Sequence, residues 1–154
     1  ANDECKHFNM LCKHLAHYDC RYGDIPSHDG LWSMAVKTEN NLVARLSMVP
    51  RYLEARGLDV TPAMLDKLNA QKDTATAEIL EVILEDEVTH VEYGTKWLDF
   101  VCQRDGINRE EVFFEHVEHF LKGQILGPFN KPLRRRAGFT DSELAELDRL
   151  DKRR

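Results

Sequence analysis

The sequence lacks the features that mark several large classes of protein. No apolar run approaches the roughly 20 residues that a membrane-spanning helix needs. Neither a phosphate-binding glycine loop nor a nucleophile elbow is present, and the absence of a Cys-x-x-Cys pair excludes a zinc ribbon. No signal peptide is recognised, so we expect a cytoplasmic protein with reduced thiols at Cys5, Cys12, Cys20 and Cys102.

Strand-like alternation and internal repeats are also missing, so we predict an all-α fold with one domain in the 154 residues. The chain is 42% hydrophobic and 31% charged, which is typical of a globular protein with a real core. Its net charge of −6 argues against a surface built for nucleic acid. We interpret the basic run near the C-terminus as solvated or paired with acidic helices rather than as an RNA contact; it comprises Lys131, Arg134, Arg135, Arg136 and residues 152–154.

One segment, residues 80–101, carries a stripe that predicts both a helix and a site. Seven residues recur at alternating steps of three and four, so they share one helical face: Leu80, Ile83, Glu87, His90, Gly94, Trp97 and Val101. The face is largely apolar, and we expect it to be buried, with Trp97 packed in the core. A buried carboxylate and imidazole are costly unless something pairs with them. The Glu-x-x-His spacing lets Glu87 and His90 bind a metal ion from one helix.

The same spacing recurs in Glu4 and His7, on a helix that we expect to reach about Asp19. Apolar residues continue along roughly the same side of this helix, namely Phe8, Leu11, Leu15 and Tyr18. A carboxylate-bridged two-metal site in a helical bundle takes a Glu-x-x-His from each of two helices and a Glu from each of two others. The two motifs therefore predict half of such a site.

A third carboxylate is expected from the next helix. We expect this helix to run from about Asp29 to Gly57, with a kink at Pro50, because a proline ring clashes with the preceding turn and leaves a carbonyl unpaired. Glu39 and Glu54 are both candidates for the ligand. Counting about 1.5 Å of rise per residue does not choose between them.

Capping and turn signals predict the remaining helices, which we expect at about 61–70, 73–103, 108–122 and from 140 to near the C-terminus. The last of these opens with a capping box that begins at Thr140. We expect residues 1–122 to form the helical core and residues 123–154 to form an extension packed on it.

Several long runs resemble the DUF455 family of ferritin-like proteins. They are YGDIPSHDGLW at 22–32, VPRYLEARGLDVTP at 49–62, DEVTHVEYG at 86–94, GPFN at 127–130 and RAGF at 136–139. The resemblance covers nearly the whole chain and implies a ferritin-like helical bundle. The family in turn resembles the di-iron tRNA hydroxylase MiaE, whose third core helix also has a Glu-Ala-Arg run. That likeness favours Glu54 over Glu39.

The resemblance implies a function as well as a fold. It implies two iron ions, or one iron and one manganese, bound by Glu4, His7, Glu54, Glu87 and His90. Such a centre would serve an O2-dependent oxidoreductase or hydroxylase with a small-molecule substrate that the sequence does not identify. Two alternatives stay open: an iron-handling protein without an organic substrate, and a non-catalytic helical module that needs a partner helix.

One part of the ferritin-like pattern is missing from the chain. Such a bundle has a helix before the first Glu-x-x-His that bears the fourth Glu, whereas this chain starts Ala1-Asn2-Asp3-Glu4 without a methionine. We expect a truncated or processed chain, with the helix removed, supplied by a partner chain or a second copy, or replaced by the helix at 111–122. That helix carries a group of polar residues, for which a rim position is expected: Glu115, His116, Glu118 and His119.

Overall fold

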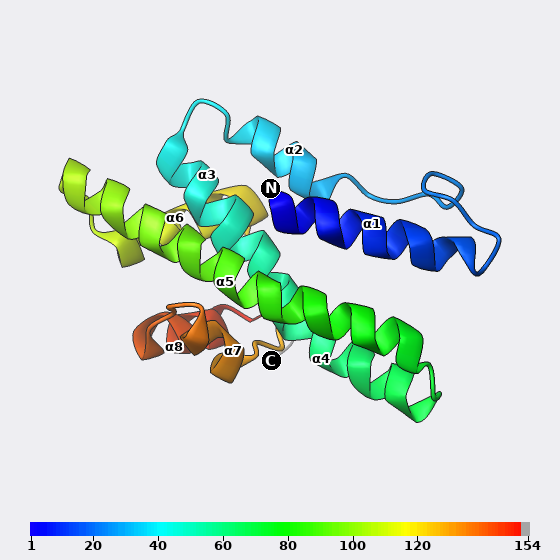
Figure 1. Cartoon of the computed structure of the whole chain (residues 1–154). Helices are drawn as coiled ribbons and strands as arrows, with labels where there is room; N and C mark the ends of the chain where they lie inside the picture. The colour runs from blue at the N-terminus through cyan, green and yellow to red at the C-terminus, as the bar shows by residue number, and fades with distance from the viewer. Residues whose placement is uncertain (152–154) are drawn as a thin grey trace.

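The computed structural model describes residues 1–151, and their regular secondary structure is entirely helical, which confirms the predicted all-α class (Figure 1). In chain order the elements are α1 (Asn2–Ala16), α2 (Gly30–Lys37), α3 (Leu42–Met48), the π-helix η1 (Val49–Glu54), α4 (Ala55–Ala70), α5 (Thr74–Asp105), α6 (Arg109–Leu121), α7 (Lys131–Arg136) and α8 (Asp141–Leu150). Figure 1 shows α5 running diagonally through the molecule, with α1 and α2 on one side and α7 and α8 on the other.

Helix α5 is the longest element, and its ends follow the sequence signals closely. The Asp73 side chain caps it by accepting a hydrogen bond from the Thr76 amide, and Gly106 ends it in the left-handed conformation with φ +67°. Helix α4 packs against α5 and joins it through a short turn at 71–73. The helix predicted at 73–103 is therefore confirmed.

The hydrophobic core brings together residues from nearly the whole chain. Fully buried side chains come from α3 to α6 and also from the segment that follows α6; they include Met48, Leu58, Leu98, Phe113, Ile125, Leu144 and Leu147. Residues beyond 122 therefore contribute to the same core as the helices before them. This segment also contains α7, which the sequence did not predict.

The prediction of a single long helix from Asp29 to Gly57 is wrong. A break at 38–41 separates α2 from α3, and the Asn41 side chain caps α3 by accepting from the Ala44 amide. At the other end, α4 continues straight through Gly57 and Pro62, so no separate helix begins at residue 61. Packing of α4 along α5 outweighs the local cost of a glycine and a proline inside a helix.

The disturbance predicted at Pro50 is confirmed, and it takes the form of a π-helical turn. Proline has no N–H to donate, so the backbone here adopts the wider η1 instead of a regular α-helix. η1 also lies very close to α5: a Cβ built on Gly94 would be 2.6 Å from Cβ of Pro50. Only a glycine permits this approach of the two helices.

The predicted burial of the whole α5 stripe is only partly confirmed, since Leu80, Ile83, Glu87 and His90 are half-buried, and it is wrong at Trp97. Gly94 and Val101 are buried, but the Trp97 side chain is 59% exposed. At about 100° per residue it lies at the edge of the stripe, on a side of α5 that the described helices leave uncovered. Tyr93 and Phe100 are exposed beside it, and we call Tyr93, Trp97 and Phe100 the aromatic edge.

The basic run near the C-terminus is paired with carboxylates, as one of the two interpretations predicted. Each of its four described members forms an ion pair: Lys131 with Asp148, Arg134 with Asp59, Arg135 with Asp141 and Arg136 with Glu85. Residues 152–154 lie outside the described residues. Within residues 1–151, no helix combines the length and the apolar character that crossing a membrane requires.

Candidate metal centre

Helices α1 and α5 bring the two Glu-x-x-His motifs face to face. The Nδ1 atom of His90 lies 3.0 Å from a Glu4 oxygen and 3.6 Å from Oε2 of Glu87. These three residues each offer a ligand atom within 4.8 Å of the others. On the α1 side, His7 is buried and its Nδ1 lies 3.6 Å from Oε2 of Glu4. Glu4, Glu87 and His90 therefore share one small volume, and His7, which is not among these three, borders it through its contact with Glu4.

An aspartate directly before each motif holds the histidine of the other motif. Asp86 on α5 lies 2.9 Å from Nε2 of His7, and Asp3 on α1 lies 3.2 Å from Nε2 of His90. A carboxylate only accepts hydrogen bonds, so Nε2–H of each histidine donates to its aspartate, while Nδ1 of each histidine faces the carboxylate of Glu4. Histidines that bind metals are commonly held in this way, with one ring nitrogen donating to a carboxylate and the other facing the metal.

The two aspartates were missed in the sequence, although a signal for them exists. Both motifs read Asp-Glu-x-x-His, at residues 3–7 and 86–90. Asp86 accepts a further hydrogen bond from Lys6, at 2.6 Å. The Lys6 and His7 hydrogen bonds hold the pKa of the Asp86 carboxyl below its usual range. Asp86 thus stays ionised while it accepts from His7.

Glu54 approaches the same volume from the end of η1. Burial raises its pKa to about 7, and the neighbouring negative charge of Glu87 adds to this rise. The charges of His90 and Glu4 also act on the Glu54 carboxyl. Glu54 is not among the three residues whose ligand atoms lie within 4.8 Å of one another. The alternative, Glu39, is exposed in the turn between α2 and α3.

The Glu87 carboxylate at this centre has an oxygen without a hydrogen-bond donor among the described residues, and its pKa is raised. Burial raises the pKa of Glu87, as does the Glu4 charge, although the nearby His90 opposes the shift. Oε2 of Glu87 is buried and accepts no hydrogen bond from the described residues. For His90 burial lowers the pKa, but the Asp3 hydrogen bond and the surrounding carboxylates outweigh it and raise the pKa overall.

This donor set fits a transition-metal ion. Carboxylate oxygen and imidazole nitrogen together suit iron, manganese and zinc, and a cation would neutralise the excess negative charge. The orphaned Glu87 oxygen is the kind of buried polar atom that a bound ion would satisfy. The residues present therefore fit a metal.

Helix α6 does not join this centre. It packs against α3 and α5, and its His116 lies 3.3 Å from the Ser47 hydroxyl on α3. Among the described residues, no contact links His116 or His119 to Glu4 or Glu87. Glu115, Glu118 and His119 are exposed, as the predicted rim position requires.

Comparison with known proteins places the chain in a family. The family described as "Protein of unknown function (DUF455)" matches residues 1–145. A protein of Haemophilus influenzae described as uncharacterized is 38% identical over 144 residues, which cover 94% of this chain and 50% of that protein. The chain thus spans about half the length of this relative. No solved structure matches the chain significantly.

Proposed function

The chain belongs to the DUF455 family, and we propose that it is a ferritin-like di-metal protein that oxidises a small organic substrate with O2. The observation that carries the proposal is the crossed pair of Asp-Glu-x-x-His motifs on α1 and α5. Two such motifs facing each other in a helical bundle are the arrangement that carboxylate-bridged two-metal sites use. The proposed relation to the tRNA hydroxylase MiaE rests on the Glu-Ala-Arg run that begins at Glu54.

In this proposal the metal ligands are Glu4, His7, Glu54, Glu87 and His90. Two iron ions, or one iron and one manganese, would supply O2 activation when bound. The protein's own contribution is to fix the donors: Asp3 and Asp86 hold each imidazole with Nδ1 toward the centre. Burial leaves the ionised forms of Glu54 and Glu87 poorly solvated and raises their pKa values, and a bound cation would stabilise those ionised forms.

The aromatic edge of α5 supports a further helix beside the centre. Tyr93, Trp97 and Phe100 recur at steps of four and three, so they line one side of α5 starting one turn after His90. Three adjacent exposed aromatic side chains are an expected interface for an amphipathic helix. We assign the fourth carboxylate to such a helix, which a longer family member would carry in its remaining half or a partner chain would supply.

Iron handling without an organic substrate is the second candidate. It is favoured by the exposure of Glu4, whose side chain is 58% accessible and which contacts His90 directly. An ion could therefore reach the centre from solvent without passing through a closed pocket. Consumption of O2 without any oxidised organic product, together with accumulation of ferric iron, would favour this candidate.

The test is anaerobic titration of the metal-free chain with Fe(II), followed by exposure to O2. About two ions per chain are expected if the centre is complete, and binding should be lost in the double variant Glu87→Ala, His90→Ala. The matched control is Glu115→Ala, His116→Ala on α6, which should bind iron as the wild type does. If the wild type binds one ion and the Glu87→Ala, His90→Ala variant binds none, another helix is needed to complete the centre. No binding by the wild type would contradict the proposal.

A further inference from the structure

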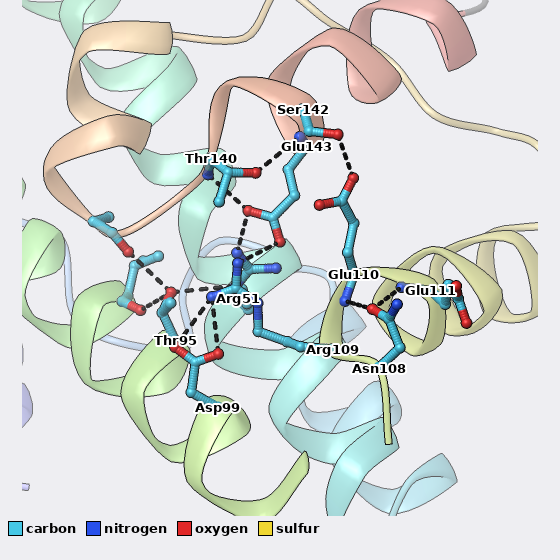
Figure 2. A network of polar contacts seen from close by, with 12 residues as sticks. Arg51, Thr95, Asp99, Asn108, Arg109, Glu110, Glu111, Thr140, Ser142 and Glu143 are labelled. Carbon is cyan, nitrogen blue, oxygen red and sulfur yellow. Dashed lines mark hydrogen bonds and ion pairs between the residues drawn. The ribbon is translucent and has the colours of Figure 1, made fainter. Parts of the chain in front are cut away.

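A buried arginine in the same helical turn as Glu54 has no role in the proposed ligand set. Arg51 lies in η1, three residues before Glu54, and its side chain is fully buried. Its guanidinium donates to Oε2 of Glu143 at 2.8 Å and to the Thr95 hydroxyl at 3.2 Å (Figure 2). It also lies against two phenylalanine rings, 4.5 Å from the centroid of Phe113 and 4.3 Å from that of Phe139. Arg51 thus joins η1 to α5, α6 and the C-terminal segment.

Glu143 is held as firmly as Arg51. It is the capping-box glutamate of α8, and its carboxylate accepts from the Thr140 amide at 2.8 Å. Arg109, at the start of α6, lies 3.1 Å from the second Glu143 oxygen and also pairs with Asp99 on α5 (Figure 2). The Glu143 carboxylate therefore links the start of α8 directly to two other helices, η1 and α6.

A second contact fixes η1 at its start. Pro50 packs against Gly94 so closely that no side chain fits between them. The adjacent Thr95 donates from its hydroxyl to the Ala137 carbonyl at 2.9 Å. Together, Pro50 and Arg51 hold η1 against α5 one turn beyond His90.

The π-helical form of η1 is what these contacts preserve. A π-helix is rarely stable by itself and occurs mostly as a single turn inside an α-helix. If η1 relaxed to an α-helix, the residues after it would shift by one position in the helical register, a rotation of about 100°. Glu54 is the last residue of η1, so this rotation would turn its carboxylate away from Glu87.

We infer that Arg51 and Glu143 are positioning residues that hold Glu54 at the metal centre through η1. The inference rests on the proposed function, because it takes Glu54 as a ligand. It couples the first turn of α8 to metal binding, although α8 contributes no ligand. The C-terminal segment then affects the affinity for the metal by fixing the position of Glu54.

A second buried ion pair provides the matched control. Arg134 and Asp59 are both buried and joined by two hydrogen bonds of 2.9 and 2.7 Å. This pair also ties the C-terminal segment to the body of the protein, and its hydrogen bonds go to α4 rather than η1, although Arg134 lies 4.8 Å from the centroid of the Phe139 ring that Arg51 also contacts. Loss of its charge should lower stability without moving Glu54.

The experiment compares Glu143→Gln, Gly94→Ala and Asp59→Asn with the wild type. Co(II) is the probe, because its visible absorption reports coordination directly, and thermal unfolding followed by circular dichroism measures stability. We expect Glu143→Gln and Gly94→Ala to weaken Co(II) binding about 10- to 100-fold and to change its spectrum. Asp59→Asn should unfold at a lower temperature yet bind Co(II) with the wild-type affinity and spectrum.

The outcomes separate this inference from the proposed function. If the wild type binds no Co(II), the proposed function fails and the inference fails with it. If the wild type binds Co(II) and folded Glu143→Gln binds it with the same affinity and spectrum, only the inference fails. Should Glu143→Gln not fold, the milder variant Arg51→Lys decides, since wild-type Co(II) affinity and spectrum in that variant overturn the inference.

Discussion

The carboxyl groups of Glu54, which is half-buried, and Glu143, which is fully buried, shift their pKa values in opposite directions. For Glu54 burial raises the pKa to about 7, and the adjacent Glu87 charge reinforces the rise. For Glu143 burial also acts to raise the pKa, but the Arg51 hydrogen bond and charge outweigh it and lower the pKa. The difference lies in the partners that each carboxylate finds.

The two clusters around these residues are built on different principles. Glu143 meets two guanidinium groups, from Arg51 and Arg109, so its charge is neutralised within the protein. Glu54 and Glu87 share one volume with Glu4, and the histidines there are themselves engaged by aspartates. The Glu143 cluster pairs its charge internally, whereas the Glu54 cluster leaves carboxylates in excess, and this excess is what the proposed cation would neutralise.

The largest expected effect comes from breaking the self-neutralised cluster. Arg51→Met leaves Glu143 buried with Arg109 as its remaining ionic partner, and we expect a loss of about 3–5 kcal/mol in the free energy of unfolding. Urea denaturation measures it. The control is Arg135→Met, which removes the exposed pair with Asp141 and should cost less than about 1 kcal/mol. Equal losses in the two variants would show that burial does not set the value of the Arg51 pair.

A gain in stability is expected from a substitution at the candidate metal centre. Because the folded pKa of Glu54 is raised from 4.5 to about 7, its contribution to stability is full below pH 4.5 and is lost as the pH rises through 7. Glu54→Gln removes this penalty. The metal-free variant should therefore be more stable than the metal-free wild type at pH 8, by about 1–3 kcal/mol. Denaturation in the presence of a chelator, at several pH values, measures the difference.

Glu143→Gln is the control of opposite sign in the same series. The folded pKa of Glu143 is lowered, so its contribution to stability is present above pH 4.5 and is lost as the pH falls through the lowered pKa. This variant should be less stable than the wild type at pH 8, and the difference should shrink in acid. A Glu54→Gln variant that is also destabilised at pH 8 would remove the contrast between the two clusters.

The smallest expected effect tests whether α4 continues as a helix through Gly57. Gly57 lies inside α4, and a Cβ built there meets nothing within 4 Å. Gly57→Ala should therefore stabilise the protein by about 0.4–1 kcal/mol, because alanine loses less backbone entropy on forming a helix. A helix that stopped at this glycine would instead be destabilised by the change. Thermal unfolding of the variant distinguishes the two outcomes.

Some features of the protein were determined by the sequence alone, because their causes lie within a few residues. The start of α5 follows from the Asp73 cap, the start of α8 from the capping box at Thr140, and the interruption of the regular α-helix near residue 50 from the Pro50 ring. The two Glu-x-x-His motifs lie on helices because their apolar neighbours follow the helical period. Each of these signals acts through local hydrogen bonds and local sterics.

Other features were decided only by the tertiary structure. Local signals stop a helix at Gly57, but packing on α5 carries α4 through it. Spacing could not choose between Glu39 and Glu54; the break at 38–41 and the π-helical turn leave Glu39 in solvent and turn Glu54 toward Glu87. The crossed aspartate–histidine pairs join residues about 80 positions apart, and the free energy of such contacts depends on how whole helices pack rather than on the sequence nearby.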